Sequence, residues 1–166
     1  MRQLFTFGGN IALLAELYRC DVRFLVVGGL AVHFYVPERQ ADDLDLLLEQ
    51  SSDNAARFFK AMSAVHVIPE FPQSLISSPS ERPQQLQFKR DHYADIVTTG
   101  ADIDFPAEWV LSQAALIGQH PARIASRNLL IRMKRKAGRE KDLADVELLE
   151  RAGQSVCGSS RTAKDS

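Results

Sequence analysis

Residues 24–48 read FLVVGGLAVHFYVPERQADDLDLLL, and this stretch decides the fold. The apolar run 24–27 predicts a strand, and the two glycines after it predict a turn. Residues 30–35 predict a short helix that stops before Pro37, because a residue that precedes proline avoids the helical conformation. Residues 43–49 predict a second strand, whose leucine run indicates burial on both faces.

The second strand opens with two carboxylates, Asp43 and Asp45. Residues i and i+2 of an extended chain point to the same face, roughly 6.6 Å apart. Two such charges repel each other, and each costs free energy to desolvate. A divalent cation between them relieves both costs, and Mg²⁺ takes only one or two carboxylates from a protein, with substrate phosphates in further positions. The alternative is that one aspartate caps a turn while the other is solvated.

Gly28 and Gly29 come just before the short helix. Without a Cβ atom, backbone can approach a ligand closely there. The first N–H groups of the following helix and its dipole favour phosphate in the same region. The alternative is a strand-to-helix turn that needs glycine for its conformation alone, and both interpretations are compatible.

Together, Gly28-Gly29-Leu30-Ala31, Arg39 and Asp43-Leu44-Asp45 resemble the signature of the DNA polymerase β-like nucleotidyltransferase superfamily. The closest resemblance is to its small bacterial members, the abortive-infection (AbiEii) toxin-type enzymes. A C-terminal run matches the same group, in which a lysine-bearing helix leads into Gly-Arg-x-Lys-Asp-x-x-Asp; here it extends from Leu129 to Asp145. The resemblance covers about residues 10–152.

The resemblance implies an α+β nucleotidyltransferase fold, with a small mixed β-sheet flanked by helices and a C-terminal helical pair. It also implies two Mg²⁺ ions held by Asp43, Asp45 and a third carboxylate on a neighbouring strand, which acts as general base. We assign that third role to Asp95, which lies in a strand-like segment. Its rivals are Asp102 and Asp104, and helix capping explains Asp104 better.

The resemblance assigns nucleotide binding to Gly28, Gly29, Arg39 and Lys134. Arg39 faces phosphate or braces the loop before the strand. Lys134 contacts the triphosphate or belongs to a solvated basic face. Arg139, Lys141, Asp142 and Asp145 have spacings suited to ion pairs between and along helices, and we interpret them mainly as structural.

The resemblance implies transfer of a nucleoside monophosphate from an NTP such as ATP to a hydroxyl acceptor. One candidate acceptor is RNA, such as a tRNA end. One candidate setting is a toxin–antitoxin or phage-defence system. The alternative is a nucleotide- or protein-binding module of the same fold without turnover. Ala41 favours the alternative, because the family commonly has threonine at that position.

The 166 residues fit one domain at 1–152, followed by a Gly/Ser-rich tail at 153–166 that we expect to be disordered. The net charge of −1 does not indicate a nucleic-acid or membrane partner. Two distant cysteines suit a reducing compartment, and there is neither a membrane-length apolar run nor a signal-peptide pattern. We therefore expect a cytoplasmic protein.

The remaining patterns predict further elements. Expected helices are 11–20 capped by Asn10, 52–65 capped by Ser51, one from Asp104 through Ala115, 127–137 capped by Ser126, and 140–151. Expected strands are 65–68, 85–89, 92–98 and 123–125, with a loop at 69–83 and a hairpin turn at 90–91.

Overall fold

The computed structural model describes residues 1–79, 85–87 and 94–158. Along the chain the elements are β1 (Gln3–Leu4), α1 (Gly8–Arg19), β2 (Phe24–Val27), α2 (Gly28–Tyr35), β3 (Leu44–Leu48), α3 (Ser52–Ala64), the 3₁₀ turn η1 (Gln73–Ile76), β4 (Gln85–Gln87), β5 (Ala94–Val97), α4 (Phe105–Leu111), β6 (Gln113–Ile117), β7 (His120–Ile124), α5 (Arg127–Ala137) and α6 (Glu140–Gly158).

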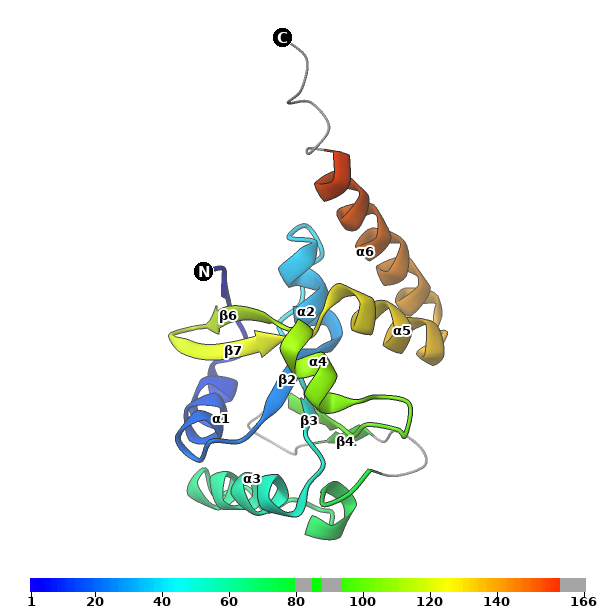
Figure 1. Ribbon diagram of the computed structural model, residues 1–166. Coiled ribbons are helices and arrows are strands. Elements are labelled where there is room, and N and C mark those ends of the chain that lie inside the picture. Colours follow the sequence, from blue (N-terminus) through cyan, green and yellow to red (C-terminus); the bar gives the residue numbers. More distant parts are fainter. Residues whose placement is uncertain (80–84, 88–93, 159–166) are drawn as a thin grey trace.

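A mixed seven-stranded sheet forms the centre of the molecule, in the order β1-β6-β7-β2-β3-β5-β4. Strands β2, β3 and β5 are adjacent in this sheet. Strand β2 runs antiparallel to β3, and β3 runs parallel to β5. Helices α1 and α3 lie side by side, while α5 and α6 form a pair beside α2 (Figure 1). The expected mixed α+β fold with a C-terminal helical pair is confirmed.

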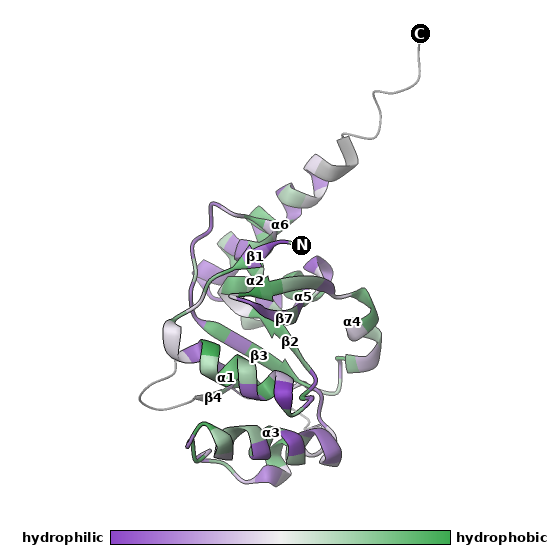
Figure 2. Cartoon of the chain, turned by 90° about the vertical axis from the view of Figure 1, so that its left-hand side faces the viewer, coloured by the Kyte–Doolittle hydropathy of each residue, from purple (hydrophilic) through white to green (hydrophobic). Residues whose placement is uncertain are grey.

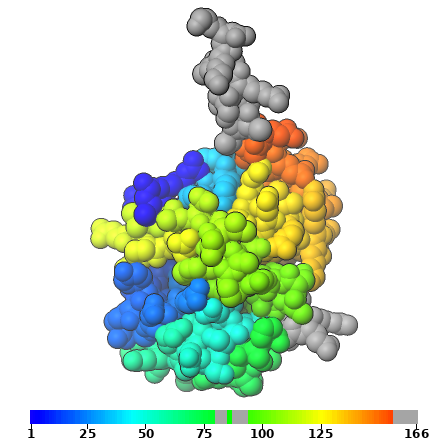
Figure 3. All heavy atoms as spheres, viewed as in Figure 1, coloured from blue at the N-terminus to red at the C-terminus, as the bar shows by residue number. Residues whose placement is uncertain are grey.

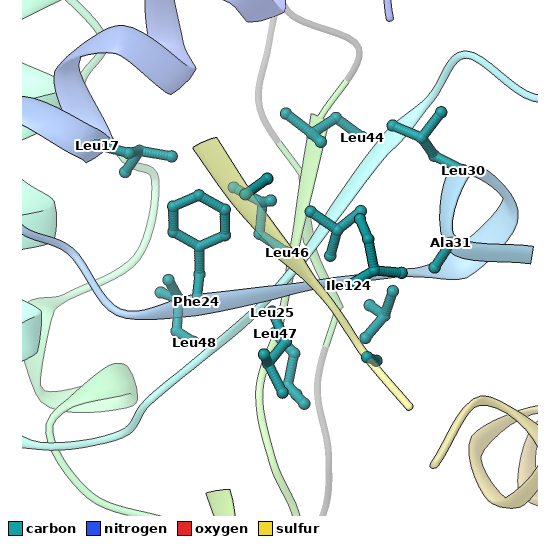
Figure 4. Packing of buried hydrophobic residues seen from close by; sticks show 14 of the residues in the cluster. Leu17, Phe24, Leu25, Leu30, Ala31, Leu44, Leu46, Leu47, Leu48 and Ile124 are labelled. Atoms are coloured by element: carbon teal, nitrogen blue, oxygen red, sulfur yellow. The ribbon is translucent and has the colours of Figure 1, made fainter. Parts of the chain in front are cut away.

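The core lies where the central strands meet the helices. Leu46, Leu47 and Leu48 are each at most 1% exposed, so β3 is buried on both faces as its leucine run predicts. Leu30 and Ala31 of α2 pack at one end of this cluster, and Leu17 of α1 packs beside Phe24 at the other (Figure 4). Each such leucine contributes roughly 1.5–3 kcal/mol by leaving water. The hydropathy colouring shows the same apolar centre along β2 and β3 (Figure 2).

Local capping signals are correct at three helix starts. Ser51 Oγ accepts from the backbone N–H of Asn54, Asp104 Oδ1 from that of Ala107, and Ser126 Oγ from that of Leu129. Each cap satisfies a backbone donor that the first turn leaves unpaired. Gly138 ends α5 in the left-handed conformation, with φ 67°, as expected for a glycine at that position.

Other predicted elements are wrong. Asn10 is not a cap: α1 begins at Gly8, and Asn10 is buried inside it. Residues 65–68 form no strand, since the chain turns there with His66 at φ 56°. The helix that was expected to reach Ala115 stops at Leu111, and β6 follows it.

The pair β1 and β6 was not foreseen, because its ladder joins segments more than 100 residues apart. Helix α6 runs on through residue 153 to Gly158. The expected hairpin turn at 90–91 and the tail from 159 lie outside the described residues, as do parts of the strands expected at 85–89 and 92–98.

Figure 3 shows one face of the molecule, with α4 at its centre, α3 below and α5 to the right. No helix in the described part of the chain has the length and apolarity needed to cross a membrane.

Candidate active site

The register of the central sheet brings two predicted acidic residues together. Asp45 of β3 is the direct partner of Asp95 in the parallel ladder with β5. Neighbouring strands lie roughly 4.8 Å apart, so side chains that are partners in register stand next to each other on one face. Asp43 precedes the first residue of β3 by one position and is exposed.

The antiparallel ladder between β2 and β3 places the glycines beside the same carboxylates. Val27, the last residue of β2, pairs with Asp45. Gly28 follows with φ 65°, and a Cβ atom built on it would overlap the Asp45 carboxylate. A side chain is therefore excluded at Gly28 both by backbone conformation and by space. Because α2 begins at Gly28, its first turn starts at the glycines and not at Leu30 as predicted.

A single cavity of about 1080 Å³ contains all seven residues that the sequence singled out. They are Gly28, Gly29, Arg39, Asp43, Asp45, Asp95 and Lys134. Carboxylates lie on the sheet side of this cavity, and cations of α5 and of the start of α6 also line it. Asp102, the rival for the third acidic role, lines the cavity too, but it is exposed and forms an ion pair with Lys136 (3.1 Å).

The negative charges of Asp43, Asp45 and Asp95 repel one another. Burial, together with repulsion from Asp95 and Asp43, raises the pKa of Asp45 to about 6, although Lys134 and Lys141 act in the opposite direction. Gln85 Nε2 donates a hydrogen bond to Asp95 Oδ2. Among residues 1–79, 85–87 and 94–158, no three His, Cys, Asp or Glu side chains form a ready-made metal-binding group. The three aspartates all line one cavity.

The donor set nevertheless suits a hard divalent cation, because carboxylate oxygens are the protein ligands of Mg²⁺. A cation would also remove the repulsion that raises the pKa of Asp45. We therefore judge Asp43, Asp45 and Asp95 chemically suited to hold such a cation.

Lys134 and Arg39, which we expected from the sequence to bind phosphate, form ion pairs with two buried carboxylates of α6. Lys134 Nζ lies 3.1 Å from Asp142 Oδ1 and 2.8 Å from Asp145 Oδ2. Arg39 Nε donates to Asp145 Oδ1 at 2.9 Å, and Arg139 Nε donates to Asp142 Oδ2 at 2.6 Å. These ion pairs link the loop before β3, helix α5 and helix α6 in one network.

Asp142 and Asp145 are 1% and 2% exposed. Burial opposes their ionisation, but hydrogen bonds from Arg139 and Lys134 hold the pKa of Asp142 below its usual value. Burial is likewise outweighed at Asp145, whose pKa is lowered by hydrogen bonds from Arg39 and Lys134. Both carboxylates are therefore charged at neutral pH, and they fix the positions of Lys134 and Arg39.

The loop that leads into Asp43 is also fixed from the N-terminal segment. Thr6 Oγ1 donates to the backbone oxygen of Asp42, and Asn10 Nδ2 donates to Thr6 Oγ1 at 3.0 Å. Sequence reasoning missed this support, because a polar residue before α1 carries no signal for a partner 36 residues away.

Solved structures of other proteins superpose on this chain and identify its fold. A lincosamide antibiotic adenylyltransferase, LnuA, in its lincomycin-bound crystal structure, superposes with a TM-score of 0.56 at 11% identity, over 89% of this chain and 98% of that one. The protein has a nucleotidyltransferase fold. An antigenic nucleotidyltransferase-like protein from Paracoccidioides brasiliensis superposes with a TM-score of 0.50 at 12% identity, over 85% of this chain and 74% of that one. No family model and no curated protein sequence matches the chain.

Proposed function

We propose that the protein is a nucleotidyltransferase that moves a nucleoside monophosphate from an NTP to a hydroxyl acceptor. The acceptor oxygen bonds to the α-phosphorus, the bond between the α- and β-phosphates breaks, and pyrophosphate leaves. The observation that carries the proposal is the Asp45–Asp95 register pair beside the Gly28 turn, inside one cavity. Paired carboxylates next to a backbone phosphate cradle suit phosphoryl chemistry, where positioning and charge neutralisation supply most of the acceleration.

In this proposal Asp43, Asp45 and Asp95 hold Mg²⁺, which when bound neutralises charge on the triphosphate and on the entering and leaving oxygens. Asp95 takes the proton of the acceptor hydroxyl. The first turn of α2 at Gly28 and Gly29 presents backbone N–H groups to phosphate. Arg39 and Lys134 add positive charge, held in place by Asp142 and Asp145.

The volume of the cavity and the comparisons bear on the acceptor. The cavity volume of about 1080 Å³ is at the upper end of the roughly 300–1,000 Å³ that is usual for small-molecule sites, which suits a ligand as large as a nucleotide. The sequence and the comparisons support two candidate acceptor classes: an RNA end, and a small antibiotic of the kind bound in the LnuA structure, lincomycin. A toxin–antitoxin setting and a protein partner are further proposals that rest on the sequence alone. A cytoplasmic location is a proposal that rests on the cysteine content and the apolar patterning of the sequence.

The test is incubation with α-³²P-labelled NTPs, Mg²⁺ and a panel of acceptors that includes bulk tRNA and lincomycin. We expect label transfer by the wild type and none by the Asp45→Asn variant. Glu150→Gln, at an exposed ion pair of α6, is the matched control and should transfer normally. Transfer that persists in Asp45→Asn would contradict the assignment.

A second candidate is a nucleotide-binding module of the same fold without turnover. The lack of a ready-made three-ligand group among the described residues favours it, as does Ala41. Here the same panel would show no transfer to any acceptor, although NTP would still bind.

A further inference from the structure

The cations that line the cavity are Arg39, Arg132, Lys134, Lys136, Arg139 and Lys141. Five of them are already paired with carboxylates. Arg39 and Lys134 pair with Asp145, Lys134 and Arg139 with Asp142, Arg132 with Glu108, and Lys136 with Asp102. Their charges are largely compensated before any ligand arrives.

Lys141 differs from these five. Within the part of the chain that the structure describes, its ammonium group has neither an ion-pair nor a hydrogen-bond partner. The acid that its i,i+4 spacing along α6 would offer, Asp145, is occupied by Lys134 and Arg39. Lys141 is exposed, lies in the first turn of α6, and lines the cavity.

The position of Lys141 relative to the acidic residues is also informative. Lys141 and Asp45 line the same cavity, and the positive charge of Lys141 lowers the pKa of the Asp45 carboxyl. A mobile ammonium on a four-carbon stem can follow a phosphate group as a point charge, whereas a cation already fixed by two buried acids cannot. An uncompensated cation facing a metal-binding region suits the polyphosphate of a bound NTP.

We propose that Lys141 is a direct ligand of the β- or γ-phosphate of the NTP, and that Arg39 and Lys134 form the fixed part of the same phosphate site. This inference rests on the proposed function. It replaces the expectation from sequence that Lys141 is a structural tie within the helical pair.

The experiment is calorimetric titration of ATP, ADP and AMP, each with Mg²⁺, into the wild type and into Lys141→Gln and Lys141→Arg. Because a charge-assisted contact is lost, ATP should bind about tenfold more weakly to Lys141→Gln while AMP binding hardly changes. Lys141→Arg should retain most of the ATP affinity. The difference between wild type and Lys141→Gln should shrink at high salt, since the contact is exposed.

Lys60→Gln is the matched control, because Lys60 is an exposed lysine of α3 outside the cavity lining, and it should bind ATP like the wild type. Melting temperatures establish that each variant is folded. Unchanged ATP affinity in Lys141→Gln, or an equal loss for AMP and ATP, overturns the inference while leaving the proposed function intact. A wild type that binds no NTP overturns both.

Discussion

Gly28 and Asp45 are packed so closely that a β-carbon on Gly28 would occupy the position of the Asp45 carboxylate. The contact exists because β2 ends opposite the start of β3, where Val27 pairs with Asp45. The turn that begins the phosphate cradle and the carboxylate that binds metal in our proposal are therefore parts of one local structure.

Gly28→Ala should lower both stability and NTP binding. The substitution strains a backbone with φ 65° and pushes Asp45 out of place, so we expect a loss of more than about 1 kcal/mol in the free energy of unfolding and a severe loss of NTP affinity. Denaturant unfolding and calorimetric titration measure the two effects.

Gly118→Ala is the control for Gly28→Ala. Gly118 has φ 59° in the β6–β7 turn, and its new Cβ would meet only the end of the Ile11 side chain at 3.1 Å. It should lose comparable stability and keep NTP affinity. If the two variants bound NTP equally well, the contact between Gly28 and Asp45 would have no functional role.

Asp145→Asn should destabilise the protein by about 3 kcal/mol at pH 7, because it leaves Lys134 and Arg39 beside a buried neutral group. Glu150→Gln breaks the exposed pair with Arg135 and should cost less than about 1 kcal/mol. Urea unfolding of both variants gives the comparison, and similar losses would argue against the buried network.

The same network predicts acid sensitivity. The folded-state pKa of Asp145 lies below the value of 3.8 expected in the unfolded chain, so its stabilising contribution is present above that pH and is lost as the pH falls through the folded-state pKa. The stability difference between wild type and Asp145→Asn should thus be constant from pH 7 to about pH 5 and shrink below about pH 4. A difference that grew on acidification would contradict the direction of this shift.

Asp45→Asn should change stability in the opposite direction to Asp145→Asn. We expect it to raise the free energy of unfolding in metal-free buffer. Asp45 has a pKa of about 6 in the folded chain against 3.8 in the unfolded one, so ionisation disfavours folding fully above about pH 6 and not at all below 3.8. We expect the variant to gain about 3 kcal/mol at pH 8 and nothing at pH 3.5. Thermal melts in EDTA-containing buffers test this, and an equal gain at both pH values would exclude electrostatic repulsion as the cause.

The elements that sequence reasoning placed correctly are those with local signals. Ser51, Asp104 and Ser126 begin their helices because a side-chain oxygen meets a backbone donor three residues on. The segment 113–117 was misassigned because nothing nearby in sequence marks it as a strand. Its two ladders join it to β7 and to β1, and the latter pairing depends on residues at the far end of the chain.

The candidate site could be predicted to the level of which residues share a cavity, since the spacing of Asp43 and Asp45 and the glycine pair before them carry that information. The pairing of its charges could not. Spacing along α6 offers Lys141 to Asp145, but Lys134 and Arg39 reach that carboxylate from α5 and from the loop before β3. Competition among cations from three segments is a tertiary property, and within the described residues it leaves Lys141 without a carboxylate partner.

The most direct test of the central claim is titration of ATP into wild type and an Asp43→Asn/Asp45→Asn double variant, with and without Mg²⁺. If Asp43, Asp45 and Asp95 bind a cation together with the nucleotide, wild type will bind ATP at least tenfold more tightly with Mg²⁺, and the double variant will show no such dependence. ATP binding by the wild type that is indifferent to Mg²⁺, or a Mg²⁺ dependence that survives in the double variant, would contradict the account.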